Sequence, residues 1–294
     1  MRVAFIGLGN LGLAMAANVA RGGHEVIGYD IVPAAVSAAA AQGIHPAASA
    51  VEAVADAQCV ITMVPSGKEL RSLFFDDGIV AAARMPGVLF IDCSTIDLTA
   101  AAACKQLARE HGHDMIDAPV SGGAPRAISG QLSIMAGGRG EAFERAEPIL
   151  ALMASNVVHM GDDGAGITVK LCNNMIAGAT LAAVGEAYAL AQRLGVDEQK
   201  FFDVVSRSSG QCWALTEMCP VPGPVPSSPA NNDFRPGGAA TMLLKDLAMA
   251  QEAALGVRAS VPMAASAYNL YNIFCAAGHG NLDVSAIIKL FQQN

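Results

Sequence analysis

Residues 2–30 read RVAFIGLGNLGLAMAANVARGGHEVIGYD, and this stretch decides the fold. It opens with a short apolar run typical of a buried β-strand, passes through a glycine-rich turn and continues into an alanine-rich segment with the character of a helix. A second apolar run then ends at Asp30. A strand, a tight turn, a helix and a second strand in close succession predict a βαβ unit.

The turn fits the pattern G-x-G-x-x-G with the residues Gly7, Leu8, Gly9, Asn10, Leu11 and Gly12. The first glycine of this pattern permits the tight turn, the second lets the backbone approach a pyrophosphate, and the third lets the helix pack closely on the strand. Unpaired N–H groups at the helix N-terminus attract the phosphate charge. We therefore expect this turn to bind a dinucleotide.

Asp30 ends the second strand, about twenty residues after the turn. A carboxylate at this place accepts hydrogen bonds from both ribose hydroxyls and repels a 2′-phosphate. The next residues, Ile31, Val32 and Pro33, supply no arginine for such a phosphate, so NAD is favoured over NADP. An aspartate that only caps the next helix is the alternative interpretation.

Four more apolar runs alternate with helix-like segments such as 33–43 and 99–112; the runs are residues 59–65, 88–94, 114–120 and 131–137. Strands that alternate with helices form a mostly parallel sheet covered on both faces. We predict an α/β fold in which residues 1–162 form a doubly wound parallel sheet of the Rossmann type.

Ligands of such sheets bind outside the carboxyl ends of the strands. Met63, Val64 and Pro65 follow one predicted strand, and Thr95 follows the next. We expect backbone groups and the Thr95 hydroxyl to meet the cofactor there, although a role in starting the following helices is equally compatible.

Beyond residue 162 the sequence changes character. Residues 168–195 contain no proline and are largely apolar, and helix-like segments recur at 197–209, 242–256, 263–278 and 283–293. We predict a long interdomain helix that leads into an all-helical domain over residues 163–294. Residues 219–238 contain six prolines, which predict neither helix nor central strand. A surface connector is one interpretation; we favour a segment that covers a site or a neighbour.

Two polar clusters predict chemistry. Ser121, Gly122 and Gly123 follow a predicted strand, and free backbone N–H groups without bulky side chains suit a carboxylate, although a flexible turn fits as well. Lys170 and Asn174 lie four residues apart near the start of the long helix, with Asn173 beside them, so the three side chains converge on one face.

Lys170 lies where the helix dipole opposes a cation, which indicates a reason other than solvation for its position. Oxidation of an alcohol by hydride transfer needs a group that takes the hydroxyl proton, and a lysine fits this role. Lys245, followed by Asp246, and Trp213 are weaker candidates: the first pair is more typical of a surface, and the tryptophan fits a core, an interface or a pocket wall.

The composition excludes several classes of protein. A formal charge of −8 and a pI near 5.2 disfavour a nucleic-acid partner. Seven cysteines without a C-x-x-C pair indicate reduced thiols and a cytoplasmic location, and His111 and His113 have no matching ligands, so we expect no metal. The apolar run 175–185 is shorter than the roughly 20 residues of a membrane span. A content of 53% hydrophobic and 15% charged residues favours a homodimer or homotetramer.

Taken together, these segments resemble the β-hydroxyacid dehydrogenase family, and within it the branch that acts on 3-hydroxyisobutyrate. The matching segments are FIGLGNLGLAMAANVARGGHEVIGYD, FIDCSTI, DAPVSGGAPRAISGQLSIMAGG, GDDGAGITVKLCNNM and MLLKDLAMA, in this order along nearly the whole chain. The resemblance implies that Lys170 is the catalytic lysine and Asn174 its partner on the helix. It implies that Ser121–Gly123 bind the substrate carboxylate and that Lys245 reaches the closed site.

The resemblance also implies that NAD is the cofactor. Its implied binding residues, with their neighbours in the same turns, are Gly7, Leu8, Gly9, Asn10, Leu11, Gly12, Asp30, Met63, Val64, Pro65, Thr95 and Lys245. We expect the protein to interconvert 3-hydroxyisobutyrate and methylmalonate semialdehyde, as in valine catabolism. Reduction of tartronate semialdehyde or another short semialdehyde is the first alternative. A catalytically silent NAD-binding scaffold or sensor is a remote one.

Overall fold

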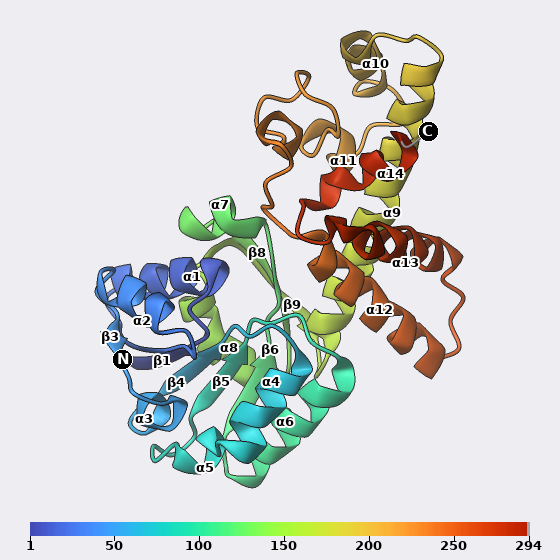
Figure 1. Ribbon diagram of the computed structural model, residues 1–294. Helices are drawn as coiled ribbons and strands as arrows, with labels where there is room; N and C mark the ends of the chain where they lie inside the picture. Colours follow the sequence, from blue (N-terminus) through green and yellow to red (C-terminus); the bar gives the residue numbers. More distant parts are fainter. Residues whose placement is uncertain (293–294) are drawn as a thin grey trace. The chain divides into compact units, whose positions relative to one another are not determined.

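The computed structural model describes residues 1–292 and separates into two compact units, the first ending at Lys170 and the second beginning at Leu171. The first unit contains a nine-stranded sheet (Figure 1). Its strands are β1 (Arg2–Ile6), β2 (Glu25–Tyr29), β3 (His45–Pro46), β4 (Cys59–Thr62), β5 (Leu89–Asp92), β6 (Asp114–Asp117), β7 (Val120–Ser121), β8 (Leu132–Gly137) and β9 (Ala154–Gly161).

The strand order is β3-β2-β1-β4-β5-β6-β8-β7, and β9 pairs with β8. From β3 to β6 every pairing is parallel, in the order of a Rossmann fold, which reverses direction between β1 and β4. The register aligns Ile6 with Thr62, and Asp92 with Asp117, so that the carboxyl ends of these strands form one edge. The predicted fold class is therefore confirmed.

Helices cover both faces of the sheet. They are α1 (Asn10–Arg21), α2 (Pro33–Ala40), α3 (Ala50–Val54), α4 (Gly67–Arg71), η1 (Ser72–Asp76), α5 (Ile79–Ala82), α6 (Leu98–Glu110), α7 (Gly123–Ile128) and α8 (Gly140–Leu150). Side chains of α1, α2 and α8 share one hydrophobic core with the strands, whereas α4 and α6 pack against each other (Figure 1). The alternation of strands and helices in the sequence produces this layering because each apolar helix face is buried against the sheet.

The sheet differs from the prediction beyond β6. All six predicted strands are present, but the run 114–120 divides into β6 and β7, and β8 pairs antiparallel with both. The strands β3 and β9 were not predicted. Most side chains of β9 remain partly or fully exposed, so the strand lacks the continuous apolar run that marks buried strands in the sequence.

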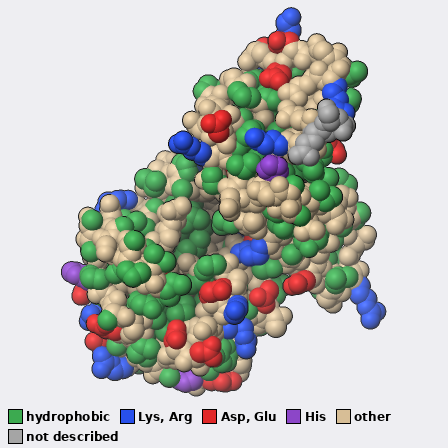
Figure 2. Space-filling view, in the orientation of Figure 1, with side chains coloured by type: hydrophobic (Ala, Val, Ile, Leu, Met, Phe, Trp, Pro, Cys, Tyr) green, Lys and Arg blue, Asp and Glu red, His purple; other side chains and the backbone are tan. Residues whose placement is uncertain are grey.

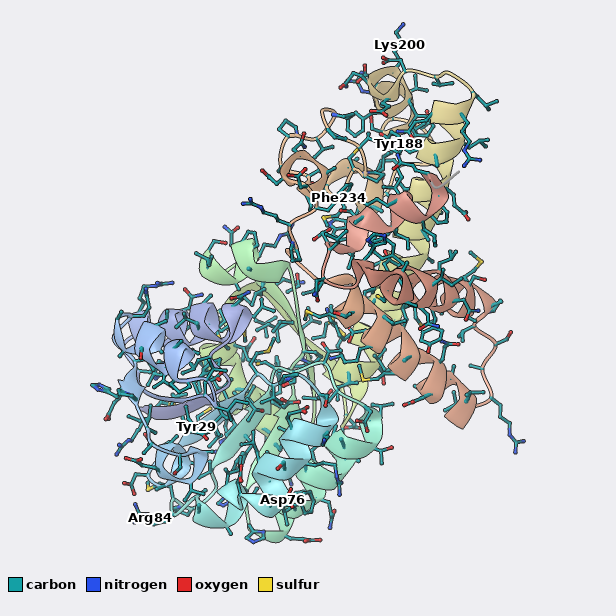
Figure 3. The ribbon with its side chains drawn as sticks, in the orientation of Figure 1. Tyr29, Asp76, Arg84, Tyr188, Lys200 and Phe234 are labelled. Carbon is teal, nitrogen blue, oxygen red and sulfur yellow. The ribbon has the colours of Figure 1, made fainter. Side chains whose placement is uncertain are left out.

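The second unit is helical, as predicted. The long helix α9 (Ala165–Arg193) starts in the first unit, and the boundary predicted after residue 162 stays a prediction. The other elements are α10 (Glu198–Val205), α11 (Trp213–Thr216), η2 (Pro229–Asn232), α12 (Ala240–Gly256), α13 (Pro262–Phe274), η3 (Cys275–His279), η4 (Val284–Ile287) and α14 (Ile288–Gln292). The core of this unit includes Tyr188 and Phe234, labelled in Figure 3.

The proline-rich segment 219–238 forms part of this core. Cys219, Val221 and Val225 are buried there together with Ala230 and Phe234. The Ser228 hydroxyl donates to the Cys219 carbonyl, which closes the segment on itself. The segment therefore packs onto its own unit rather than running over the surface as a simple connector.

Helix α9 is long and apolar enough to cross a bilayer by length and composition alone. Helices in the cores of soluble proteins pass the same test, so one such helix is weak evidence, and the absence of a membrane span stays a prediction. On the face drawn in Figure 2, Lys and Arg side chains are scattered among acidic and apolar ones. Within residues 1–292, no group of three or more His, Cys, Asp or Glu side chains is arranged to hold a metal ion.

Candidate active site

The glycine turn lies between the ends of β1 and β4, at the point where the strand order reverses. Gly7 has a φ of 95°, and a Cβ there would lie 2.1 Å from the Met63 carbonyl oxygen. A Cβ on Gly12 would lie 2.0 Å from the Gly7 carbonyl oxygen. A Cβ on Gly9 would meet nothing within 4 Å. Packing thus requires the first and third glycines, and the second faces open space.

This open space fits a dinucleotide phosphate. Gly9 is the N-cap of α1, without a side-chain capping bond, and its carbonyl accepts the first helical hydrogen bond from Leu13. The N–H groups of Asn10, Leu11 and Gly12 precede that bond and point out of the helix N-terminus. Such amides, together with the helix dipole, bind phosphate.

Asp30 is tied directly to the turn. Its Oδ2 accepts a hydrogen bond of 2.7 Å from the Leu8 N–H, and its Oδ1 accepts one of 2.8 Å from the Val32 N–H. The Leu8 side chain is buried in the core, so Leu8 meets the turn through its backbone. The structure therefore brings the predicted ribose-binding carboxylate beside the predicted phosphate-binding turn.

A second carboxylate, which is buried, supports the loop after β4. Asp92 Oδ1 accepts hydrogen bonds from the hydroxyls of Thr62, at 2.8 Å, and Ser94, at 2.7 Å. The Ser94 hydroxyl in turn accepts 2.8 Å from the Val64 N–H. Burial raises the pKa of Asp92 to about 6, against the hydrogen bonds from Ser94 and Thr62. This series of hydrogen bonds links the Met63–Pro65 loop to the segment that carries Thr95.

The predicted carboxylate loop has a backbone that only glycine adopts without strain. Gly122 and Gly123 both have positive φ, 135° and 69°, and follow Ser121 at the end of β7. A Cβ on Gly122 would lie 2.9 Å from the Arg126 side chain. Two successive glycines thus keep the backbone accessible beside the Ser121 hydroxyl, which is suited to a carboxylate.

Lys170 is the last residue of the first unit and is only 9% exposed, in the second turn of α9. Its helix neighbours Asn173 and Asn174 belong to the second unit. Asn173 Nδ2 donates to Asn174 Oδ1 at 3.0 Å, and Asn174 Nδ2 donates to Asp246 Oδ2 at 2.6 Å. Because the oxygen of the Asn174 amide accepts one bond and its nitrogen donates the other, the orientation of this amide is fixed.

Asp246 is a partner of Asn174 that the sequence alone does not identify. It lies on α12 beside Lys245, whose Nζ is 3.5 Å from Asp246 Oδ1, and it anchors Asn174. The sequence signal was its position next to a lysine in an otherwise apolar helix. Trp213 begins α11 and is 47% exposed, so its indole is not part of the helical core.

Two family models match the chain. The model described as the NAD binding domain of 6-phosphogluconate dehydrogenase matches residues 2–161. The model described as NAD-binding of NADP-dependent 3-hydroxyisobutyrate dehydrogenase matches residues 164–291. Together with the fold and the glycine turn, these matches define an NAD-dependent dehydrogenase.

Individual relatives narrow the class. A probable 3-hydroxyisobutyrate dehydrogenase of Mycobacterium tuberculosis is 46% identical, over 97% of this chain and 96% of its own length. An NAD-dependent L-serine dehydrogenase of Pseudomonas aeruginosa is 40% identical, over 99% and 97%. A solved structure of the M. tuberculosis 3-hydroxyisobutyrate dehydrogenase with L-serine has a TM-score of 0.93 at 46% identity and covers 99% of both chains. The chain belongs to the β-hydroxyacid dehydrogenase family.

The first prediction concerns Asp30. Asp30→Ala removes the ribose acceptor and should lower kcat/KM for NAD by about 10- to 100-fold, since a hydrogen bond to a charged group contributes roughly 1.5–3 kcal/mol. The ratio of NAD to NADP turnover should fall because repulsion of a 2′-phosphate is also lost. Asp76→Ala, at an exposed site, is the control for the loss of one negative charge. An unchanged cofactor ratio in Asp30→Ala would contradict the assignment.

The second prediction concerns Asp92. Because its pKa in the folded protein, about 6, exceeds the ordinary aspartate pKa of 3.8, the folded state holds the proton more tightly, and stability is lost as pH rises from about 4 to about 6. The loss is on the order of 3 kcal/mol. Asp92→Asn should abolish this part of the pH dependence of urea unfolding and be more stable than the wild type at pH 7. Asp56→Asn, at a half-exposed site, should keep the wild-type dependence of stability on pH. If Asp92→Asn also kept the wild-type dependence, the role of Asp92 burial would be refuted.

Proposed function

We propose that the protein oxidises 3-hydroxyisobutyrate to methylmalonate semialdehyde with NAD, reversibly. The observation that carries the proposal is the joint presence of a buried lysine and a loop with two successive positive-φ glycines in an NAD-binding unit. Lys170, the Ser121–Gly123 loop and the Gly7–Gly12 turn all belong to residues 1–170. A silent NAD-binding scaffold has no use for the first two.

The residues divide the chemistry between them. The backbone N–H groups of the Ser121–Gly123 loop bind the substrate carboxylate, and Lys170 accepts the proton of the substrate hydroxyl. NAD, when bound, accepts the hydride from the same carbon. Asn174, whose amide is oriented by Asp246, supports the geometry of the lysine and the substrate from the next turn of α9. In the reverse direction Lys170 returns the proton to the forming alkoxide.

L-serine is a second candidate substrate. It is also a short 3-hydroxy acid with a carboxylate, and a relative at 40% identity is named an L-serine dehydrogenase. The M. tuberculosis relative was solved together with L-serine. A half-exposed Trp213 favours the methyl-branched acid, as does the name of the 46% identical relative. Tartronate semialdehyde, which carries a hydroxyl where methylmalonate semialdehyde carries a methyl group, is the third candidate substrate.

Four wider assignments accompany this proposal. All seven cysteines are free, which supports a reducing compartment such as the cytoplasm. Exposed apolar side chains on α9, including Ile176 and Leu190, and that of Leu194 directly after the helix support a homodimer or homotetramer. The two family matches, which meet at residues 161 and 164, support a domain boundary after residue 162. Participation in valine catabolism follows if 3-hydroxyisobutyrate is the substrate.

The third prediction is the substrate order. With NAD, kcat/KM should be highest for 3-hydroxyisobutyrate and lower for D-glycerate by at least about 10-fold, because an apolar pocket that gains or loses a small group discriminates by roughly 10- to 200-fold. Initial rates of NADH formation for both enantiomers of 3-hydroxyisobutyrate, L-serine and D-glycerate give the order, with NADP in parallel. A preference for L-serine would select the second candidate, and a preference for D-glycerate would overturn both.

A further inference from the structure

A buried ion pair joins α6 to the sheet at the place where α9 begins. Lys105, on α6, is 2% exposed, and Asp117, the last residue of β6, is fully buried. Lys105 Nζ donates to Asp117 Oδ1, to the Gly137 carbonyl at 3.2 Å and to Asp163 Oδ1 at 3.2 Å. A lysine ammonium has three protons, so each has a partner. The pair is therefore fully satisfied by the ends of β6 and β8 and by the turn before α9.

Asp117 caps α9 from another element. Its Oδ1 accepts 2.9 Å from the Gly164 N–H, and its Oδ2 accepts 2.9 Å from the Ile167 N–H. Both amides lie at the helix N-terminus, where backbone donors lack helical partners. A carboxylate is favoured there by the helix dipole as well as by the hydrogen bonds. Helix capping is usually performed by a Ser or Asp directly before the helix. Here it is performed by Asp117, which precedes Gly164 by 47 residues and Ile167 by 50.

Close packing fixes the same helical turn against the sheet. A Cβ on Gly166 would lie 2.2 Å from the Met135 carbonyl oxygen and 2.8 Å from Asp117 Oδ2. A Cβ on Gly137 would lie 2.6 Å from the Gly166 N atom. The contacts with Met135 and with the Gly166 N atom are to backbone atoms, which cannot give way as a flexible side chain does. The first turn of α9 therefore has one position only.

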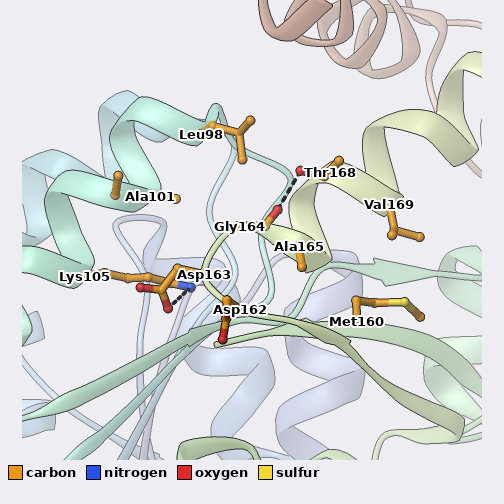
Figure 4. A pocket seen from close by; sticks show the side chains of 11 residues that line it. Leu98, Ala101, Lys105, Met160, Asp162, Asp163, Gly164, Ala165, Thr168 and Val169 are labelled. Carbon is orange, nitrogen blue, oxygen red and sulfur yellow. Dashed lines mark hydrogen bonds and ion pairs between the residues drawn. The ribbon is translucent and has the colours of Figure 1, made fainter. Parts of the chain in front are cut away.

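We call the contact of Lys105 and Asp117 with the start of α9 the α9 joint. Figure 4 shows its outer side, with Lys105 and Asp163 facing each other beside the start of α9. Asp163 also pairs with Arg109, at 2.6 Å, and is 36% exposed. A hollow of about 650 Å³ lies between α6 and the segment 160–169. Asp163 belongs to the ion cluster but, unlike Asp117, lies at the solvent side, which makes it a matched control.

We propose that Asp117, held in place by Lys105, is a positioning residue for the reaction. The inference rests on the proposed function of Lys170. Lys170 lies one helical turn after Ile167, and Ser121 lies four residues after Asp117. The Asp117 carboxylate thereby sets the start of the helix that carries the proposed proton acceptor, and its backbone ends the strand that leads into the proposed carboxylate-binding loop. A shift of about 1 Å in such a frame lowers turnover by about 100-fold.

The fourth prediction compares Asp117→Asn with Asp163→Asn in the full-length protein. Asp117→Asn leaves one acceptor where two held α9, so kcat per NADH-binding site should fall by about 10- to 100-fold and KM should rise. The concentration of sites comes from titration with NADH fluorescence, and the Kd for NADH should not change. Asp163→Asn should keep the wild-type kcat and KM. If activity is lost only in proportion to NADH-binding sites, at wild-type kcat per site, the role is structural and the proposal is overturned.

A second pair of variants reaches the same joint without changing a charge, because Asp117→Asn leaves a buried lysine without its carboxylate. Gly166→Ala displaces the first turn of α9 against Met135 and should lower kcat per site while KM stays unchanged, since the Ser121 loop is not touched. Gly140→Ala, at the start of α8 with nothing within 4 Å of the new Cβ, should have no effect. A Gly166→Ala variant with wild-type kcat would overturn the proposal.

Lys170→Met separates this proposal from the proposed function. If Lys170→Met retains wild-type turnover, Lys170 is not the proton acceptor and the proposed function fails. If Lys170→Met is inactive while Asp117→Asn and Gly166→Ala both keep wild-type kcat per site, only the positioning role fails.

Discussion

The carboxylate of Asp117 connects the sheet to α9, and the geometry of the site follows from this connection. It holds two backbone N–H groups at the start of the helix and is neutralised by a buried lysine. Removing a carboxylate from such a pair is costly because the lysine would remain buried without compensation. The fold therefore uses a strong, directional contact at the start of the helix that carries Lys170, the proposed proton acceptor.

Three strand-end carboxylates share this arrangement. Asp30 follows β2 and holds the glycine turn, Asp92 ends β5 and holds the loop after β4 through Ser94, and Asp117 ends β6 and holds α9. Their charges are accommodated differently. Asp30 is partly exposed to water, Asp117 is paired with Lys105, and Asp92 is buried with a raised pKa and no cation bonded to it among the described residues. Each carboxylate fixes the loop that a ligand of such a sheet is expected to contact.

The local parts of this arrangement were predictable from the sequence. The spacing of Gly7, Gly9 and Gly12 after an apolar run predicts the turn, and the structure shows the packing that requires the first and third. Asp30 was predictable because its place is set by one βαβ unit. Lys170 and Asn174 were predictable as neighbours on one helix, since helical periodicity alone puts them on one face.

The long-range parts were not predictable in the same way. Lys105 and Asp117 are 12 residues apart, and Asp117 and Ile167 are 50 apart, so no periodic pattern joins them. A signal was present nonetheless: Lys105 is a charge on an otherwise apolar face of α6, and Asp117 is a charge at the end of a buried strand. Asp246 was missed as the anchor of Asn174 for the same reason, 72 residues away. The strand β9 was missed because its exposed side chains hide the pattern of a strand.

The most direct test of the account is chemical rescue of Lys170→Ala by small primary amines. If Lys170 accepts the hydroxyl proton, the variant should bind NADH normally and turn over slowly, and added amine should raise the rate of NADH formation in proportion to its concentration and with a dependence on its basicity. Undiminished turnover of Lys170→Ala without amine, unaffected by its addition, would contradict the central claim that this lysine performs the proton transfer.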